Sequence, residues 1–417
     1  MSDFIYRDGE LHAEGVPVRT LAETYGTPLY VYSRAHLLRQ YRALAEAMRE
    51  VRPLICYAVK TNTNAAVIRA VAREGAGADV VSGGELFRAL QAGVPAGKIV
   101  FAGVGKTERE IDYALGQGIR FFTVESEPEL ERMSAVARRA GRTARVAIRV
   151  NPDVDPKTHK HTSTGKRETK FGVDIERAES GYELAARLPG LEIAGLHMHL
   201  GSPIMSIDPY VEALEKVAPM CARMRARFPS FRELDLGGGL GIPYRPEQAP
   251  FDLAGFAAEV VPRVRATGMT LVLEPGRFIA GNAGILVARV QYVKDNPFKK
   301  FVVIDAAMND LIRPPLYEAH HELRAVRETG ETMLGDVVGP ICESTDYMTQ
   351  NRRVPAVAQG DLLAILSAGA YGFAMASNYN SRGRAAEVMV DGDRHALTRA
   401  RETWEDLVRG ETIPDWA

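Results

Sequence analysis

Short apolar runs alternate with longer amphipathic segments along the middle of the chain. Eight apolar runs read as buried strands, at residues 54–59, 78–82, 98–103, 120–125, 145–150, 192–200, 233–238 and 270–275. Helical patterns lie between them, such as residues 64–75, 107–118, 127–141 and 209–228. Eight strand–helix repeats over about 225 residues predict a (β/α)8 barrel, an α/β fold. An open doubly wound sheet is the alternative, because periodicity does not show whether a sheet closes.

The pattern changes after Arg277. Apolar segments joined by turns then predict strands within residues 283–296, 299–308, 331–340, 360–371 and 386–392. Residues 3–18 have the same hairpin character, and residues 398–411 suggest a closing helix. We therefore expect a barrel domain over residues 33–278. A separate β-sandwich or β-barrel domain, with a C-terminal helix, would combine residues 1–32 and 279–417.

Composition and charge limit the partners and the compartment that we expect for the protein. Hydrophobic residues make up 46% of the 417 residues and charged residues 25%, with a formal charge of −1. These values are ordinary for a globular protein and give no reason to expect nucleic acid or a membrane as partner. The chain start lacks the basic and apolar blocks of a signal peptide. Three cysteines without paired spacing predict no disulfide framework, so a reducing cytoplasm is expected.

The C-terminal ends of barrel strands carry the active site in this fold. Lys60 ends the first apolar run, where it is either a surface lysine or an amine held for covalent chemistry. His197 and His199 end the sixth run two residues apart, so they point to opposite faces and are unlikely partners for one metal. We expect His197 to be structural or outward-facing, and His199 to lie nearer the mouth of the barrel.

The seventh and eighth runs end in groups suited to an anion and a charged ligand. The stretch "LDLGGGLGIPY" offers glycine amides to an anion, at the position where barrels often bind phosphate. It is not a dinucleotide fingerprint, because Ile242 stands where the third glycine is required. Glu274 and Arg277 end the eighth run, and they either pair structurally or serve a ligand.

Two motifs are dismissed. "AGVGKT" resembles the end of a phosphate-binding loop but has Val100 in place of the required glycine. The histidine pairs of "THKH" and "HH" lack partner ligands at metal spacing, so no metal site is expected.

The remaining groups are those that pyridoxal 5′-phosphate requires. The Lys60 amine would bond to its aldehyde, while the glycine turn and Ser202 would hold its phosphate. His199 would stack on the ring. Glu274 would keep the pyridine nitrogen protonated.

The chain also resembles the diaminopimelate decarboxylases, within the fold-type III (alanine-racemase-like) pyridoxal-phosphate enzymes. The resemblance covers nearly the whole chain, through the blocks "YAVKTN", "ADVVSGGEL", "HMHLGS", "DLGGGLGIPY", "EPGR", "MNDLIRPPLY", "GPICESTDYM" and "GAYG". Single blocks are weak, but their order and joint presence are specific. The resemblance implies removal of CO2 from the D-centre of meso-2,6-diaminopimelate, which yields L-lysine in the last step of lysine biosynthesis.

The resemblance implies roles for individual residues. Lys60 would be the Schiff-base lysine, His199 the stacked residue and Glu274 the partner of the pyridine nitrogen. Further cofactor contacts are implied for Ser202, Gly238, Gly239, Gly276, Arg277 and Tyr371. Asp79 is a weaker candidate, which would support the residues that touch the cofactor.

The same resemblance implies substrate contacts from Arg277, Arg313, Tyr317 and Tyr371. Cys342 and Glu343 would come from the second subunit of a homodimer, with Glu343 reading the distal amino group. Lys60 and Cys342 are both candidates for protonating the product at Cα. The polar loop 151–172 is expected to act as a lid.

Three other functions compete with this interpretation. A decarboxylase for ornithine, arginine or D-lysine would not need both Arg313 and Glu343. A non-catalytic regulatory relative would not need Lys60, Glu274, His199 and Cys342. An amino-acid racemase of this fold usually places arginine, not a carboxylate, at the pyridine nitrogen.

Overall fold

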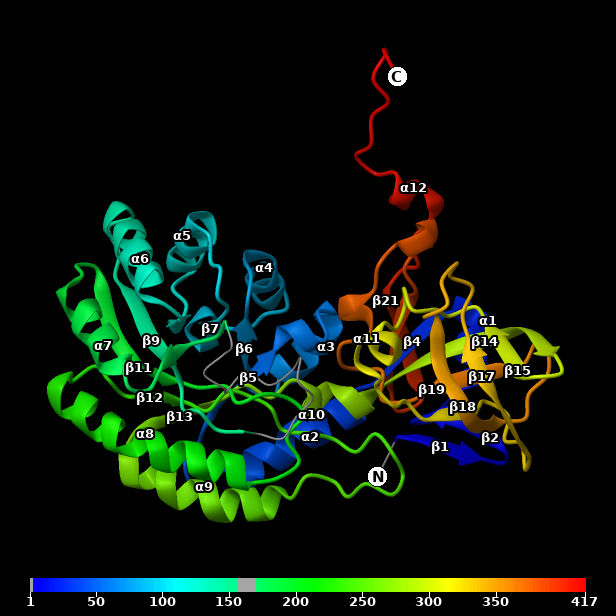
Figure 1. The fold of residues 1–417 in the computed structure, drawn as a ribbon, viewed down its shortest axis with the longest axis horizontal. Helices are drawn as coiled ribbons and strands as arrows, with labels where there is room; N and C mark the ends of the chain where they lie inside the picture. The colour runs from blue at the N-terminus through cyan, green and yellow to red at the C-terminus, as the bar shows by residue number, and fades with distance from the viewer. Residues whose placement is uncertain (1–2, 156–169) are drawn as a thin grey trace. The chain divides into compact units, whose positions relative to one another are not determined.

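A computed structural model describes residues 3–155 and 170–417, and the chain forms two compact units (Figure 1). The barrel unit comprises Leu38–Pro243 and Ala249–Ile279, and the sheet unit comprises Met1–Leu37, Tyr244–Gln248 and Ala280–Ala417. Most of the expected lid loop, residues 156–169, lies outside the described residues. Among the described residues, no helix is long and apolar enough to cross a membrane.

The barrel unit is built on a closed ring of eight parallel strands. They are β5 (Leu54–Ala58), β6 (Gly77–Val80), β7 (Ile99–Phe101), β8 (Phe121–Val124), β9 (Ala144–Asn151), β11 (Leu191–His197), β12 (Glu233–Asp235) and β13 (Thr270–Leu273). Because β8 pairs with β9 and β13 pairs with β5, the ring has no free edge. The predicted (β/α)8 barrel is confirmed, and the open sheet is excluded.

A helix follows each strand of the ring. These helices are α3 (Ala65–Ala72), α4 (Gly83–Gln91), α5 (Glu108–Gln117), α6 (Glu127–Arg139), α7 (Ala178–Arg187), α8 (Asp208–Arg227), α9 (Leu253–Thr267) and α10 (Arg277–Ala280). Helix α2 (Arg34–Ala47) precedes the first strand, and the short β10 (Val173–Asp174) pairs with β9. Small and apolar side chains, including Cys56, Val100, Phe121 and Val272, form a buried cluster contributed by the strands.

The polar residues after β5 have a local structural role. Asn64 is the N-cap of α3 and accepts a hydrogen bond from the Ala66 amide at 2.9 Å. Asn62 accepts one from the Asn64 amide at 3.0 Å. These bonds satisfy amides at the start of the helix, so α3 begins at Ala65, five residues after Lys60.

The sheet unit contains a three-stranded and a nine-stranded sheet. The first consists of β1 (Phe4–Arg7), β2 (Glu10–Ala13) and β3 (Val16–Pro17). The second consists of β4 (Leu29–Ser33), β14 (Gly284–Asp295), β15 (Lys300–Ile304), β16 (Leu323–Ala325), β17 (Thr332–Val338), β18 (Tyr347–Pro355), β19 (Leu362–Ile365), β20 (Ala386–Asp391) and β21 (Arg394–Arg399). In this sheet β4 lies between β14 and β20. The separate β-rich region is thus confirmed.

The expected closing helix is much shorter than the sequence pattern suggests. Residues Arg394–Arg399 form β21, which pairs antiparallel with β20, so the start of the amphipathic segment is already used in a sheet. A single helical turn follows, α12 (Trp404–Leu407), with a capping box between Thr403 and Asp406. The other helices of the unit are α1 (Val18–Tyr25) and α11 (Arg313–Tyr317).

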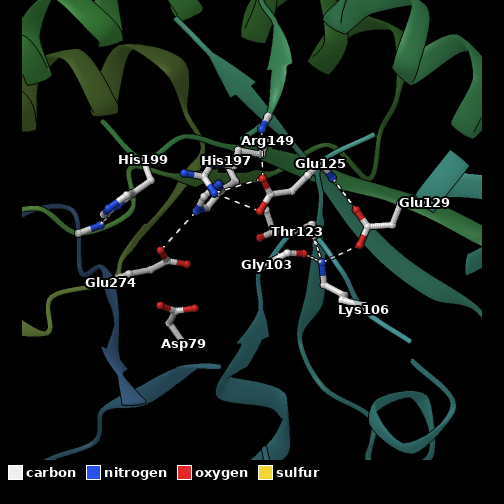
Figure 2. A network of polar contacts seen from close by, with 12 residues as sticks. Asp79, Gly103, Lys106, Thr123, Glu125, Glu129, Arg149, His197, His199 and Glu274 are labelled. Atoms are coloured by element: carbon white, nitrogen blue, oxygen red, sulfur yellow. Dashed lines mark hydrogen bonds and ion pairs between the residues drawn. The ribbon is translucent and has the colours of Figure 1, made fainter. Parts of the chain in front are cut away.

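Lys106, from the dismissed "AGVGKT" motif, has a structural role in the barrel. Its ammonium group donates to Gly103 O at 2.7 Å and Thr123 O at 2.5 Å, and pairs with Glu129 at 2.8 Å (Figure 2). Lys106 is only 3% exposed. It therefore ties the loop after β7 to β8 and α6.

We expect Lys106→Ala to lower the free energy of unfolding by about 3–5 kcal/mol, because it leaves the buried Glu129 carboxylate without its cation. Urea unfolding measures the loss. Arg139→Ala is the matched control, since the Arg139–Glu108 pair is 61% and 57% exposed and should contribute less than about 1 kcal/mol. Equal losses in the two variants would contradict the structural role of Lys106.

Candidate active site

Lys60 is held at the end of β5 by a buried carboxylate. It lies in the turn η1 (Val59–Thr61), and its ammonium group pairs with Asp79 of β6. Ala58 and Asp79 are register partners, which puts Asp79 on the same face of the sheet as Ala58, two residues before Lys60. The Lys60 side chain is 32% exposed and that of Asp79 is fully buried. Lys60 is therefore not an ordinary surface lysine, and Asp79 contacts it directly.

The acidity of Asp79 reflects its surroundings. Burial raises the pKa of this carboxyl, and the nearby Glu274 raises it further, while Lys60 lowers it. The ion pair therefore stabilises a carboxylate that would be costly in isolation.

The imidazole of His199 is neutral. The Gly238 amide donates to His199 Nδ1 at 3.1 Å, which leaves the proton of the ring on Nε2. Burial, followed by the charges of Arg149 and Lys60, lowers the pKa of His199 well below its usual value. The imidazole is therefore uncharged at neutral pH.

The glycine turn is packed too closely for side chains. Gly237 and Gly239 have positive φ angles of 67° and 100°. A Cβ on Gly239 would lie 2.5 Å from Gly201 O, and one on Gly238 would lie 2.2 Å from Glu274 O. The Gly237 amide donates to Asp235 at 2.8 Å, so Gly237 and Gly238 already use their amides within the site.

Glu274 is paired with His197, not with Arg277, among the described residues. His197 Nε2 lies 3.3 Å from Glu274 Oε2, and the two residues are 1% and 4% exposed (Figure 2). Of the two expectations for His197, structural or outward-facing, the second is wrong, because the residue is buried in β11 beside β12. Burial alone would raise the pKa of Glu274, but the charge and hydrogen bond of His197, with Lys60, lower it to about 2.

Arg277 and Ser202 contact each other near the same strand ends. Arg277 Nε donates to Ser202 Oγ at 3.1 Å, and the arginine is 7% exposed. Gly276, just before it, is crowded by Thr61, whose Cγ2 lies 2.2 Å from the position of a Cβ. The structure therefore brings Arg277 and Ser202 together, in contact with the segments that carry Lys60 and His199.

Five of the predicted residues belong to the sheet unit. They are Arg313, Tyr317, Cys342, Glu343 and Tyr371.

Within the sheet unit, these residues have partners of their own. Arg313 Nη1 donates to the Tyr244 hydroxyl at 2.7 Å, and the guanidinium lies 5.0 Å from the centre of that ring. The Cys342 amide donates to Asn380 Oδ1 at 2.9 Å. The Glu343 carboxylate accepts a hydrogen bond from Thr345, which lowers its pKa. Cys342 and Glu343 are both exposed in the single chain.

Glu85 is a titratable neighbour of Lys60 that the sequence did not single out. Its Oε2 accepts a hydrogen bond from the Val81 amide at 2.8 Å. Burial raises the pKa of Glu85 to about 7, and the charge of Asp79 contributes in the same direction. Ionisation of Glu85 therefore costs more in the folded than in the unfolded protein.

We expect Glu85→Gln to remove a pH-dependent loss of stability. Because the folded pKa is raised, the wild type loses stability between pH 4.5 and about 7 relative to the variant. The difference should reach on the order of 2–3 kcal/mol. Thermal unfolding of both proteins at pH 5 and pH 8 measures it, and curves that shift in parallel would contradict the prediction.

Asp235 is a second buried acid near the site that the sequence pattern did not indicate. It lies fully buried in β12, its Oδ1 accepts the Gly237 amide, and its pKa is raised well above the usual value by burial and by Glu274. The available indication was an acid inside an apolar run, where burial is costly without a partner. That Asp235 lies beside His197 was not predictable, because it depends on the register between β11 and β12.

The residues present fit pyridoxal 5′-phosphate. The buried Glu274 Oε1 has no hydrogen-bond partner among the described residues, as expected of an oxygen that meets a ligand. At Gly239 and Gly276 a Cβ would clash with Gly201 O and Thr61 Cγ2, so glycine lets these strand ends pack closely together. Lys60 supplies the amine at the same strand ends.

Residues 34–281 match the family described as pyridoxal-dependent decarboxylase, pyridoxal binding domain. This match covers the whole ring of strands. Together with the closed barrel, it defines a pyridoxal-dependent decarboxylase.

Similarity extends beyond the barrel. The diaminopimelate decarboxylase of Pseudomonas aeruginosa is 50% identical over 415 residues, covering 99% of both chains. The structure of diaminopimelate decarboxylase from Helicobacter pylori complexed with L-lysine has a TM-score of 0.90 at 39% identity, covering 94% of this chain and 98% of that one. A lysine/ornithine decarboxylase from Vibrio vulnificus complexed with putrescine has a TM-score of 0.79 at 26% identity, covering 90% and 97%. The chain belongs to the diaminopimelate decarboxylase family, so the resemblance found in the sequence is confirmed.

Proposed function

We propose that this protein removes CO2 from the D-configured centre of meso-diaminopimelate and releases L-lysine. The observation that carries the proposal is the similarity over nearly the full length to enzymes named for this reaction. The barrel geometry supports the chemistry independently, because it sets an amine, a neutral imidazole and a buried carboxylate at the C-terminal ends of β5, β11 and β13.

The contacts in the barrel support a place for the cofactor. Lys60 would bond to its aldehyde, His199 would stack on its ring and Glu274 would accept a hydrogen bond from its pyridine nitrogen. Gly239, Ser202 and Arg277 would bind the phosphate, with Gly276 beside them. Gly237 and Gly238 would not, because their amides already donate to Asp235 and His199. Tyr371 is a further phosphate contact. When bound, pyridoxal 5′-phosphate supplies an electron-accepting ring for the electron pair left by departing CO2.

The protein's own groups direct this chemistry. Asp79 holds the free Lys60 ammonium group at the strand end, where the cofactor aldehyde would meet it. Ionised Glu274 favours a proton on the pyridine nitrogen, because a carboxylate in a buried site attracts the cationic form of its partner. Lys60 and Cys342 both remain candidates for protonating the product.

Substrate selection depends on the end of the molecule that does not react. This end carries a carboxylate and an ammonium group. Arg277 and Arg313 offer the guanidinium forks that bind carboxylates in a bidentate manner, with Tyr317 and Tyr371 beside the substrate. Glu343 offers the counter-charge for the ammonium. Ornithine and arginine lack the distal carboxylate, so Arg313 favours diaminopimelate over them.

Cys342 and Glu343 reach a substrate site from the second subunit of a homodimer. Their exposure in the single chain supports this assignment, because a donated pair must be accessible before assembly.

The three free cysteines are consistent with a protein that works in a reducing cytoplasm.

The experiment that tests the function incubates the purified protein with pyridoxal phosphate and meso-diaminopimelate, and quantifies lysine by chiral chromatography. Parallel reactions contain ornithine, arginine or D-lysine. L-lysine from meso-diaminopimelate is the expected product. CO2 from one of the other substrates, with no lysine from diaminopimelate, would keep the cofactor and overturn the substrate.

A further inference from the structure

Three buried polar groups meet at the ends of three adjacent barrel strands. His197 and Asp235 are register partners across β11 and β12, and Asp235 is the register partner of Val272 in β13. Glu274 follows Val272 by two residues and so continues on the same face. One nitrogen of His197 and one oxygen from each carboxyl group lie within 4.8 Å of one another. The three side chains therefore form one cluster.

Two oxygens of this cluster lack a donor. Asp235 Oδ2 and Glu274 Oε1 are buried, and neither has a hydrogen-bond partner among the described residues. Their remaining oxygens are satisfied, because Asp235 Oδ1 accepts the Gly237 amide and Glu274 Oε2 accepts from His197. Two ionised carboxylates at this distance would repel each other in a buried site. One proton placed between them removes the repulsion and gives Asp235 Oδ2 a partner, while the second lone pair of Glu274 Oε1 stays open to the pyridine nitrogen.

The surroundings decide which carboxyl carries that proton. Glu274 has His197 as a direct donor, and Lys60 and His199 lie close enough to favour its charged form. Asp235 receives only a backbone amide, and the neighbouring carboxylates of Glu274 and Asp79 oppose its ionisation. The proton therefore belongs on Asp235.

We propose that Asp235 is a neutral carboxylic acid that donates to Glu274 and, together with His197, forms a positioning pair that keeps Glu274 ionised and fixed in orientation. Donors on two sides leave the Glu274 carboxylate little freedom to rotate. The proposal rests on the proposed role of Glu274 at the pyridine nitrogen. It adds that this role depends on an acid and an imidazole that need not touch cofactor or substrate.

The protonation state is measured on the apoprotein, so its outcome does not depend on activity. We compare infrared spectra of the wild type and Asp235→Asn in D2O at pH 7. The difference spectrum should contain the C=O band of a protonated carboxylic acid. Asp112→Asn is the matched control on the exposed face of α5, and its difference spectrum should contain only ionised-carboxylate bands. A wild-type spectrum in which Asp235 gives only carboxylate bands would overturn the proposal.

The positioning role is measured on the holoenzyme by comparing two substitutions at Asp235. Asn keeps a donor for Glu274 and an acceptor for the Gly237 amide, whereas Ala keeps neither. We expect Asp235→Ala to have a kcat about 10–100-fold below that of Asp235→Asn. Equal losses of kcat in the two folded variants would overturn the donor role. If no variant or wild type forms lysine, the function fails, while the infrared result still decides the protonation state.

Discussion

Replacing Lys60 by alanine is expected to lower kcat for meso-diaminopimelate by about 10⁴-fold or more. Lys60 is the lysine that ends the first barrel strand, and its amine is held by the buried Asp79. Alanine removes the only group at this position that can bond to the cofactor aldehyde. L-lysine formation by chiral chromatography measures the loss, and absorbance of the purified protein measures how much cofactor remains bound.

Lys98→Ala provides the control for Lys60→Ala. Lys98 precedes β7 and donates to Gly75 O at 2.9 Å on the exposed side of the barrel unit. We expect this variant to keep wild-type activity. A Lys60→Ala protein within about tenfold of the wild type would contradict the assignment of Lys60 and return it to a structural role.

Glu274→Gln is expected to lower kcat by about 10²–10³-fold while the protein stays folded. Gln has nearly the same shape but no charge, so it cannot favour a proton on the pyridine nitrogen. Because the pKa of Glu274 is lowered to about 2, the wild-type carboxylate is ionised throughout pH 5–9. The ratio of wild-type to variant kcat should therefore stay nearly constant over this range.

Stability gives a second measurement on Glu274. A lowered folded pKa stabilises the protein above the unfolded value of about 4.5, and this contribution is lost as the pH falls toward 2. Acid unfolding curves of wild type and Glu274→Gln should accordingly converge at low pH. Glu131→Gln, on the exposed side of α6, is the control for the change of charge. A ratio of kcat values that rises steeply with pH would contradict the low pKa.

The barrel was predictable because its signals are local. Each strand is a short apolar run bounded by polar or glycine residues, and the observed strands differ from the predicted runs by only a few residues. The closing helix was not predictable in the same way. Residues 398–399 have a helical pattern but pair with β20, because the sheet offers backbone partners that an isolated helical turn does not.

The same difference between local signals and strand pairing separates the site residues that were predictable from those that were not. Lys60, His199 and Glu274 stand out because each is a charged or polar residue at or near the end of an apolar run. His197 and Asp235 stand earlier in their runs, and their proximity depends on the register of β11 and β12, which apolar periodicity does not contain. The residues of the sheet unit had no local signal at all, and only the resemblance to a family singled them out.

The placement of β4 has a consequence for how the protein is made. All five of its residues, Leu29–Ser33, are buried, and its two neighbours are β14 and β20. At synthesis rates of about 5–20 residues per second, the β20 partner emerges from the ribosome roughly 20–70 s after β4. Until β14 and then β20 are made, at least one edge of this buried strand is unpaired, which favours association with other chains. We therefore expect the yield of folded protein to depend on translation speed and chaperone supply.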